Sequence, residues 1–209
     1  MKRIDEQQLE TDLANRYEYL AEFIGFTPDD VEAIHRLAPR LTPHIPKIVE
    51  QTYAKLLSYD ATARHFLPRQ SGYEGDLPAS LAELGPEARQ IQFRKEHLRR
   101  YLTSLVGNAY DARMVNYLDV VGKIHTPRAG NKAIDVPLVQ MNALLGLLAD
   151  LLIETIHQLE LEPTVERQSL RAFNKLLWIQ NDFVNRHYAG STPQTAPTPT
   201  PPPAASAWR

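Results

Sequence analysis

The 209-residue chain contains no cysteine, which excludes disulfides, thiolate catalysis, zinc–thiolate centres and iron–sulfur clusters. Neither charge is in excess: the net charge of −2 gives no overall electrostatic reason to bind nucleic acid or an anionic membrane. Long apolar runs are lacking too, because the longest, 143–153, is interrupted by Gly146 and Asp150 and is too short to span a membrane. The first residues form no apolar signal core. We therefore expect a cytoplasmic protein without a nucleic-acid or membrane partner.

Local enzyme signatures are also missing. The sequence has no Gly-rich phosphate loop, no Gly-x-Ser-x-Gly turn and no His-Glu-x-x-His pair. It contains no convincing strand-like alternation of apolar and polar residues, and no Asn-Gly or Asp-Gly hairpin turn. Apolar residues recur instead at helical spacing, which predicts an all-α fold.

The composition divides the chain into one large domain and a short tail. Residues 189–209 contain six prolines among Ser, Thr and Ala, and Arg209 is their only charged side chain. Such a segment buries too little apolar surface to offset the entropy of ordering, so we predict a disordered or polyproline-like tail. Residues 1–188 are enough to bury a substantial core, and we expect them to form a single domain.

Caps and prolines set the expected helix ends within this domain. Thr27 and Pro28 are suited to begin a helix, Gly107 to end one, and Pro39 and Pro127 to stop the helices before them. The expected helices cover about residues 5–23, 27–37, 42–59, 86–106, 111–125, 135–161 and 163–188, with a short piece near 78–84.

One of the seven histidines ends an apolar helical face. The inward set of the 111–125 helix has the i, i+3, i+4, i+7 spacing and consists of Met114, Tyr117, Leu118, Val121, Ile124 and His125. A neutral imidazole in that position can project into an apolar cavity as the proximal ligand of a haem iron, with its other ring nitrogen donating to a backbone carbonyl. The alternative is a histidine at the edge of the core that bonds only to the backbone.

Tyr53 is the second candidate for a functional side chain. It follows Val49 by four residues and precedes Leu56 by three, so it faces the core. A buried phenol needs a hydrogen-bond partner, and a diatomic ligand with partial negative charge could accept a bond worth about 1.5–3 kcal/mol. The alternative is a core tyrosine bonded to a backbone carbonyl.

Two further patterns have ordinary explanations. Glu32 with His35, and Glu154 with His157, have the Glu-x-x-His spacing of di-iron bundles, but Glu154 falls on a polar stripe and matching carboxylates on two further helices are missing. The basic run 94–100 is typical of solvated helix surface, although one or two of its members could pair with haem propionates.

These residues resemble those of the protoglobins and the related sensor globins of globin-coupled sensors. In that family a Tyr-Asp pair opens the proximal helix and the haem-ligating histidine closes it after Gly-x-x, as Tyr110-Asp111 and Gly122-x-x-His125 do here. The segment 49–57 resembles the distal helix, where Tyr53 matches the family's tyrosine. The resemblance covers about residues 5–188 and implies a globin-like helical sandwich with an extra N-terminal helix.

The resemblance also implies which residues contact the cofactor, one haem b. His125 would bind the iron, Tyr53 would face the gas ligand, and Phe66 would lie over the haem edge. The rest of the pocket would come from Leu98, Val121, Val139, Ala143, Leu147 and Leu151. Thr52 and Leu98 stand where many relatives carry bulky aromatic residues, which predicts a roomier distal pocket.

The function implied by the resemblance is reversible binding of O2, CO or NO, as a carrier or a gas sensor. Relatives dimerise through their two C-terminal helices, so we expect a homodimer. A haem enzyme acting on NO or on reactive nitrogen or oxygen species is the alternative, although the sequence shows no flavin or nicotinamide domain and no placed acid–base pair. A haem-free helical interaction module is the third hypothesis, and an absorption spectrum separates it from the other two.

Overall fold

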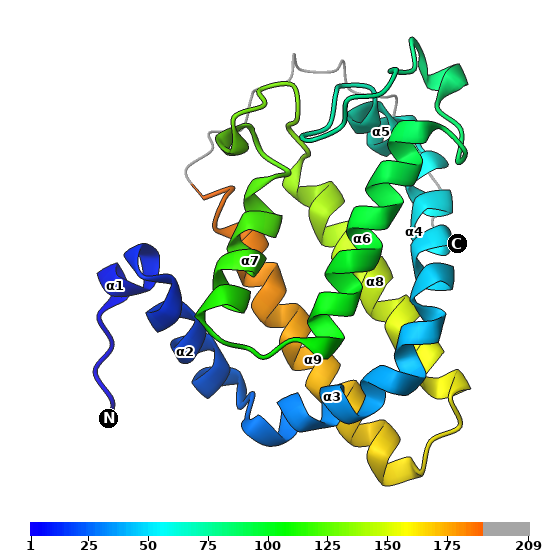
Figure 1. Ribbon diagram of the computed structural model, residues 1–209. Helices are drawn as coiled ribbons and strands as arrows, with labels where there is room; N and C mark the ends of the chain where they lie inside the picture. Colours follow the sequence, from blue (N-terminus) through cyan, green and yellow to red (C-terminus); the bar gives the residue numbers. More distant parts are fainter. Residues whose placement is uncertain (190–209) are drawn as a thin grey trace, which may run out of the picture.

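A computed structural model describes residues 1–189, and every regular element in that part of the chain is a helix (Figure 1). The all-α prediction is therefore confirmed. The α-helices are α1 (Glu6–Thr11), α2 (Leu13–Ile24), α3 (Pro28–Leu41), α4 (Ile45–Leu57), α5 (Asp60–Ala63), α6 (Arg89–Gly107), α7 (Ala112–Lys123), α8 (Leu138–Gln158) and α9 (Pro163–Asn185). Short 3-10 helices cover Thr42–His44, Arg64–Phe66, Leu81–Glu83 and Pro127–Ala129. Beyond Ala189, the predicted tail lies outside the described residues.

The N-terminal helix, expected to run unbroken over 5–23, is two helices. Asp12 has an extended backbone, and its carboxylate accepts hydrogen bonds from the amides of Ala14 and Asn15 at 2.9 and 3.1 Å. An aspartate that caps a helix in this way competes with continuation of the helix before it. The capping preference of Asp12 therefore ends α1 and begins α2.

The prediction that Pro39 ends the second helix near Leu37 is wrong. α3 begins at Pro28 as expected, but it continues through Pro39 to Leu41 and leads through a 3-10 turn into α4. Leu37 and Leu41 are both buried in the core, with exposed fractions of 3% and 0%. Burying a leucine stabilises by about 1.5–3 kcal/mol, enough to offset much of the cost of a proline inside the helix.

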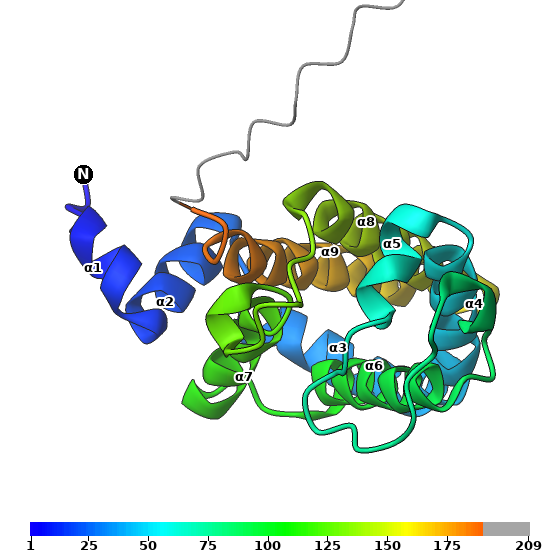
Figure 2. The same cartoon turned by 90° about the horizontal axis from the view of Figure 1, so that it is seen from above.

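The long helices pack in two layers (Figure 2). One layer contains α3, α6 and α7, and the other contains α4, α8 and α9. Within the layers α3 packs against α6, and α8 against both α4 and α9; across them α3 and α7 contact α9 while α4 contacts α6. The N-terminal helix α2 lies outside this sandwich and packs against α7 and α9. The core is continuous through both layers.

α8 extends beyond the apolar run 143–153 at both ends, but it begins later and ends earlier than the expected 135–161. By length and composition alone its 21 residues could cross a membrane, and only 28% of its most apolar 18-residue window is buried. Its contacts with α4 and α9 are those of a core helix in a folded domain. Much of its apolar surface nevertheless remains exposed.

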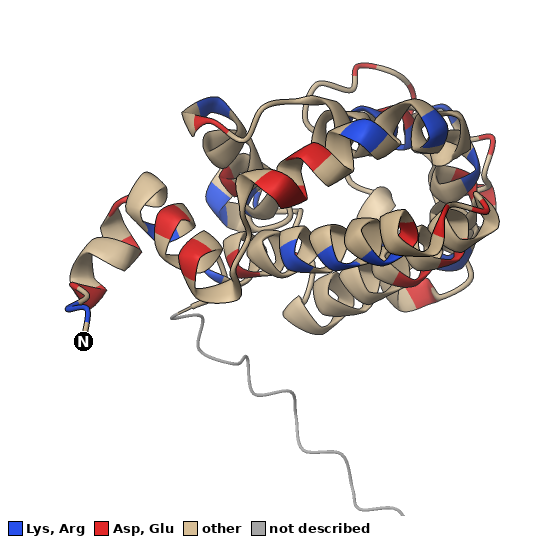
Figure 3. Cartoon of the chain, turned by 90° about the horizontal axis from the view of Figure 1, so that it is seen from below, with Lys and Arg blue, Asp and Glu red and all other residues tan. Residues whose placement is uncertain are grey.

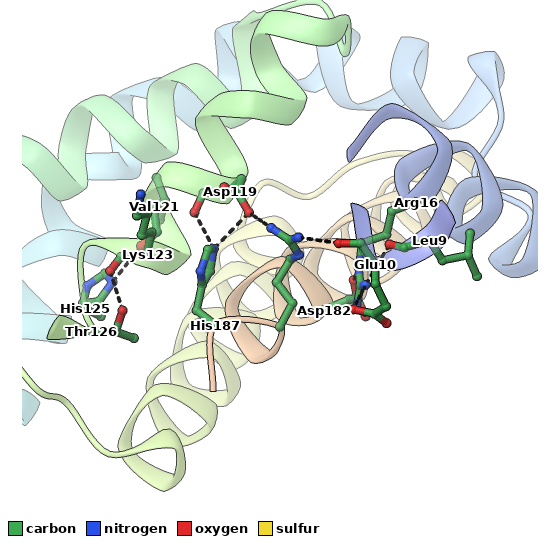
Figure 4. Close-up of polar contacts among 11 residues, drawn as sticks. Leu9, Glu10, Arg16, Asp119, Val121, Lys123, His125, Thr126, Asp182 and His187 are labelled. Carbon is green, nitrogen blue, oxygen red and sulfur yellow. Dashed lines mark hydrogen bonds and ion pairs between the residues drawn. The ribbon is translucent and has the colours of Figure 1, made fainter. Parts of the chain in front are cut away.

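Ion pairs join the N-terminal helices to the layers (Figure 4). The Arg16 guanidinium of α2 donates to the Asp182 carboxylate of α9, with its Nη2 at 2.9 Å. A second cluster joins α7 to the residues that follow α9. There Asp119 of α7 accepts hydrogen bonds from Arg186 and from the His187 ring, whose Nε2 lies 2.9 Å from the carboxylate. Elsewhere basic and acidic residues are interspersed along the described helices in the view of Figure 3, as the near-neutral net charge leads one to expect.

Candidate functional site

A cavity of about 310 Å³ lies between the two layers. This volume falls at the lower end of the roughly 300–1,000 Å³ range of small-molecule and cofactor sites. Its apolar lining consists of Leu56, Phe66, Leu98, Val120, Val121, Ile124, Ile134, Val136, Met141, Leu144, Leu145, Leu148 and Val184. Its polar lining consists of Tyr53, Thr62, His65, Gln70, Arg94, His97, Tyr101, Tyr117, His125, Gln140 and Gln180. The lining is thus mainly apolar and includes no carboxylate.

His125 borders this cavity from the turn that follows α7. The helix ends at Lys123, two residues earlier than expected, but the His125 Nδ1 still reaches back to the Val121 carbonyl at 2.8 Å (Figure 4). Because a carbonyl only accepts, Nδ1 carries the proton and Nε2 keeps its lone pair. The backbone carbonyl of His125 accepts from the Val136 amide at 3.0 Å, which fixes the turn against the segment leading into α8.

The surroundings of His125 keep its ring neutral. Burial and the nearby positive charge of Arg94 lower the pKa of His125 to about 4, and the hydrogen bond with Val121 opposes this shift only in part. At neutral pH the ring is therefore uncharged, which is the form that binds a metal ion. The expected tautomer, with one nitrogen on a backbone carbonyl and the other free to coordinate, is the one that the structure contains.

Gly122 determines how closely the end of α7 approaches α9. A Cβ at this position would lie 2.6 Å from the Phe183 carbonyl oxygen and 3.0 Å from the Val184 Cα, which are both backbone atoms and cannot move aside easily. Gly122 is itself buried. The absence of a side chain here permits the contact between the two helices, and this contact sets the position of His125 three residues later.

Tyr53 borders the cavity from α4. Only 3% of the residue is exposed, and its ring centroid lies 5.6 Å from that of Phe66. Burial raises the pKa of Tyr53, while the adjacent Arg94 guanidinium partly opposes the rise. The phenol is therefore protonated at neutral pH and able to donate. Its neighbour Thr52 does not border the cavity, because its hydroxyl turns back to donate to the Ile48 carbonyl at 2.8 Å.

The structure brings five of the nine expected site residues to the cavity, namely Tyr53, Phe66, Leu98, Val121 and His125. The four taken from the penultimate helix are absent from its lining; they are Val139, Ala143, Leu147 and Leu151. Val139 is 73% exposed. The face of α8 that borders the cavity is instead made up of Gln140, Met141, Leu144, Leu145 and Leu148.

Several polar residues of the lining do not follow from the sequence pattern alone. Arg94 belongs to the basic run 94–100, but it also lies on the inward stripe of α6 with Ile91 and Leu98, and this spacing is the signal that reveals it. His97 also borders the cavity, and its Nδ1 donates to the Phe93 carbonyl at 2.8 Å. Buried polar atoms without a hydrogen-bond partner occur on the lining residues His65, Arg94, Gln140 and Gln180.

The Glu-x-x-His pairs lie apart from this cavity. His35 hydrogen-bonds the Asn108 carbonyl at 2.9 Å, and Glu32 is exposed. The exposed His157 is paired with Glu166 at 2.9 Å. Both histidines are therefore engaged in structural contacts.

An all-helical sandwich of three helices on three, with a half-buried neutral histidine and a buried tyrosine facing one apolar cavity, defines a globin. A family model for the protoglobins matches residues 13–192. The chain belongs to the protoglobin family. In structure it is similar to the globin domain of a globin-coupled sensor from Geobacter sulfurreducens, with a TM-score of 0.64, 20% sequence identity, and coverage of 82% of this chain and 97% of that one. A search of curated proteins gives no match.

The residues at the cavity fit the haem of this family. A haem needs an uncharged nitrogen donor for its iron, apolar walls for the ring and polar groups for its propionates. The unengaged Nε2 of His125 meets the first requirement, and the mainly apolar lining meets the second. His65 and Gln180 carry buried polar atoms without a protein partner, and a ligand would supply partners for them.

Proposed function

We propose that the protein binds one haem b in this cavity and reversibly binds a diatomic gas there, as a carrier or a sensor. His125 would hold the iron through Nε2. One observation carries the proposal: His125 is neutral, its Nδ1 is fixed by the Val121 carbonyl, and its Nε2 is left unengaged at an apolar cavity. A histidine that served only to bond the backbone would not need an unengaged Nε2 at an apolar cavity.

When bound, the haem supplies an iron with a coordination position for O2, CO or NO. Tyr53 would donate its hydroxyl proton to the gas ligand, since the phenol is protonated and borders the cavity. Phe66, Leu98 and Val121 would exclude water from the ligand and pack against the ring. An apolar wall with one donor strengthens that hydrogen bond, because few water molecules compete for it.

We further propose that the protein forms a homodimer through α8 and α9. Val139, Gly146 and Ile153 recur every seven residues on α8 and therefore share one face, and Val139 and Ile153 are 73% and 53% exposed. Trp178 on the neighbouring helix α9 is 59% exposed. A stripe of exposed apolar side chains on two adjacent helices is suited to pack against the same stripe of a second copy.

Titration of the purified protein with hemin, followed by its absorption spectrum, tests the haem proposal. We expect a Soret band that saturates at one haem per chain. His125→Ala should abolish or strongly weaken the band, whereas His157→Ala, which removes an exposed histidine, should leave it intact. A wild-type protein that stays colourless, or a His125→Ala variant with an unchanged band, would refute the proposal.

A further inference from the structure

Arg94 stands out among the cationic residues of α6. It lines the cavity, its side chain is only partly exposed, and its Nε is buried without a hydrogen-bond partner. The cost of burying a guanidinium falls only when its donors and its charge find partners. The environment of Arg94 therefore leaves room for a partner that is not part of the protein.

The cations that follow Arg94 in the same helix all have carboxylate partners. Lys95 pairs with Glu50 at 2.7 Å, and Arg99 and Arg100 pair with Glu96 at 2.7 and 2.8 Å. Within residues 1–189 Arg94 forms no ion pair, and the cavity lining contains no Asp or Glu that could approach it. The cavity thus holds an uncompensated positive charge.

Tyr53 adds a second donor at the same place. The Arg94 guanidinium lies beside the Tyr53 hydroxyl and favours its ionised form, although burial keeps the phenol protonated. A guanidinium can only donate, so it cannot accept the hydroxyl proton of Tyr53. None of the hydrogen bonds of the described residues gives that hydroxyl a protein acceptor. The Tyr53 hydroxyl oxygen can accept from one donor of the guanidinium. The buried Nε of Arg94 still has no partner, so the charge of Arg94 and the hydroxyl proton of Tyr53 meet on one side of the cavity.

We propose that Arg94 and Tyr53 form a subsite for a small monovalent anion, of the size and charge of nitrite or azide, bound inside the cavity as a ligand of the haem. The inference rests on the proposed haem site. Phe66 and Leu98 supply apolar walls next to the two donors and would keep water away from the anion. A charged hydrogen bond is stronger where few water molecules compete for it. A diatomic gas accepts the hydrogen bond of Tyr53 with only a partial negative charge, whereas a full anion gains more from the positive charge of Arg94.

The test compares anionic with neutral ligands of the ferric, haem-loaded protein. Nitrite, azide and imidazole are each titrated at fixed ionic strength and followed by absorption, in the wild type, Arg94→Met, Arg94→Lys and the surface control Arg99→Met. We expect Arg94→Met to lower the affinity for nitrite and azide by roughly tenfold or more, which corresponds to the loss of a hydrogen bond to a charged group. Its affinity for imidazole should fall by less than about threefold. Arg94→Lys should retain more anion affinity than Arg94→Met, and the control should match the wild type.

Equal changes for all three probes, or no change, would overturn the proposal. A haem propionate is the other anion that could occupy Arg94; in that case Arg94→Met would speed haem transfer to an acceptor apoglobin while the anion-to-imidazole affinity ratio stayed constant, which also overturns it. Should Arg94→Met fail to fold, Tyr53→Phe provides the same comparison, with a selective loss of anion affinity expected. If no haem binds at all, the proposed function itself has failed.

Discussion

The low pKa of His125 makes the stability of the haem-free protein depend on pH between the pKa of the folded protein and that of the unfolded chain. Burial and the charge of Arg94 lower the pKa from 6.5 to about 4 in the folded protein, while the unfolded chain keeps the ordinary value. Between these two pH values the unfolded chain binds more protons than the folded one. The free energy of unfolding therefore falls as the pH drops through this window, and the contribution is fully present only above it.

The size of the effect follows from the two pKa values. A fall in the pKa of His125 from 6.5 to about 4 on folding corresponds to about 3 kcal/mol of the free energy of unfolding, once the pH has crossed both values. Between pH 7 and pH 5, where most proteins remain foldable, the same titration removes about 2 kcal/mol of stability. This is a large fraction of the roughly 5–15 kcal/mol that stabilises a typical domain.

Urea unfolding of the haem-free protein at pH 7 and pH 5 measures this contribution. His125→Gln is the matched variant, because glutamine can still donate to the Val121 carbonyl but does not titrate. The wild type should lose about 2 kcal/mol more than His125→Gln over this interval, and contributions from other groups, including the lowered pKa of His65, cancel in the comparison. Equal losses in the two proteins would refute the burial and tautomer assigned to His125.

Three further predictions concern the gas ligand, the helix packing and the dimer. Tyr53→Phe should speed release of O2 by about tenfold in stopped-flow measurements, and an unchanged rate would remove Tyr53 from the ligand site. Gly122→Ala should lower the free energy of unfolding by about 1–3 kcal/mol in thermal or urea unfolding, because its Cβ meets the Phe183 carbonyl. Gly107→Ala, with open space around it, should lower it little, and equal effects would contradict the packing. Trp178→Glu should shift the protein from dimer to monomer in sedimentation experiments without loss of helicity, and a dimer that survives would place the interface elsewhere.

The helical class and the two central side chains could be predicted because each depends on local pattern. The inward spacing of Met114, Leu118 and Val121 reaches His125 directly, and that of Val49 and Leu56 includes Tyr53. The inward face of each of these two helices follows from its own sequence and does not depend on which helices pack against it. The hydrogen bond from His125 to Val121 also follows from local geometry, since the two residues are four apart.

The residues that α8 contributes could not be predicted in the same way. This helix carries apolar side chains on more than one face, so periodicity does not distinguish the stripe of Met141, Leu144 and Leu148 from the stripe of Val139 and Ala143. Which stripe faces inward is decided by the packing of α8 against α4 and α9, which is a long-range property. Helix ends failed for a related reason at Pro39, where burial of Leu41 outweighs the local preference.

The most direct test of the account asks whether the ring nitrogen of His125 is the group that holds the haem. In His125→Gly the imidazole is removed and its space left open, so free imidazole can take its place in the cavity. We predict that the haem-loaded, ferrous His125→Gly protein loses the wild-type absorption spectrum and regains it when imidazole is added, while His97→Ala, which removes another cavity histidine, keeps the wild-type spectrum throughout. A His125→Gly protein that shows the wild-type spectrum without imidazole would contradict the account.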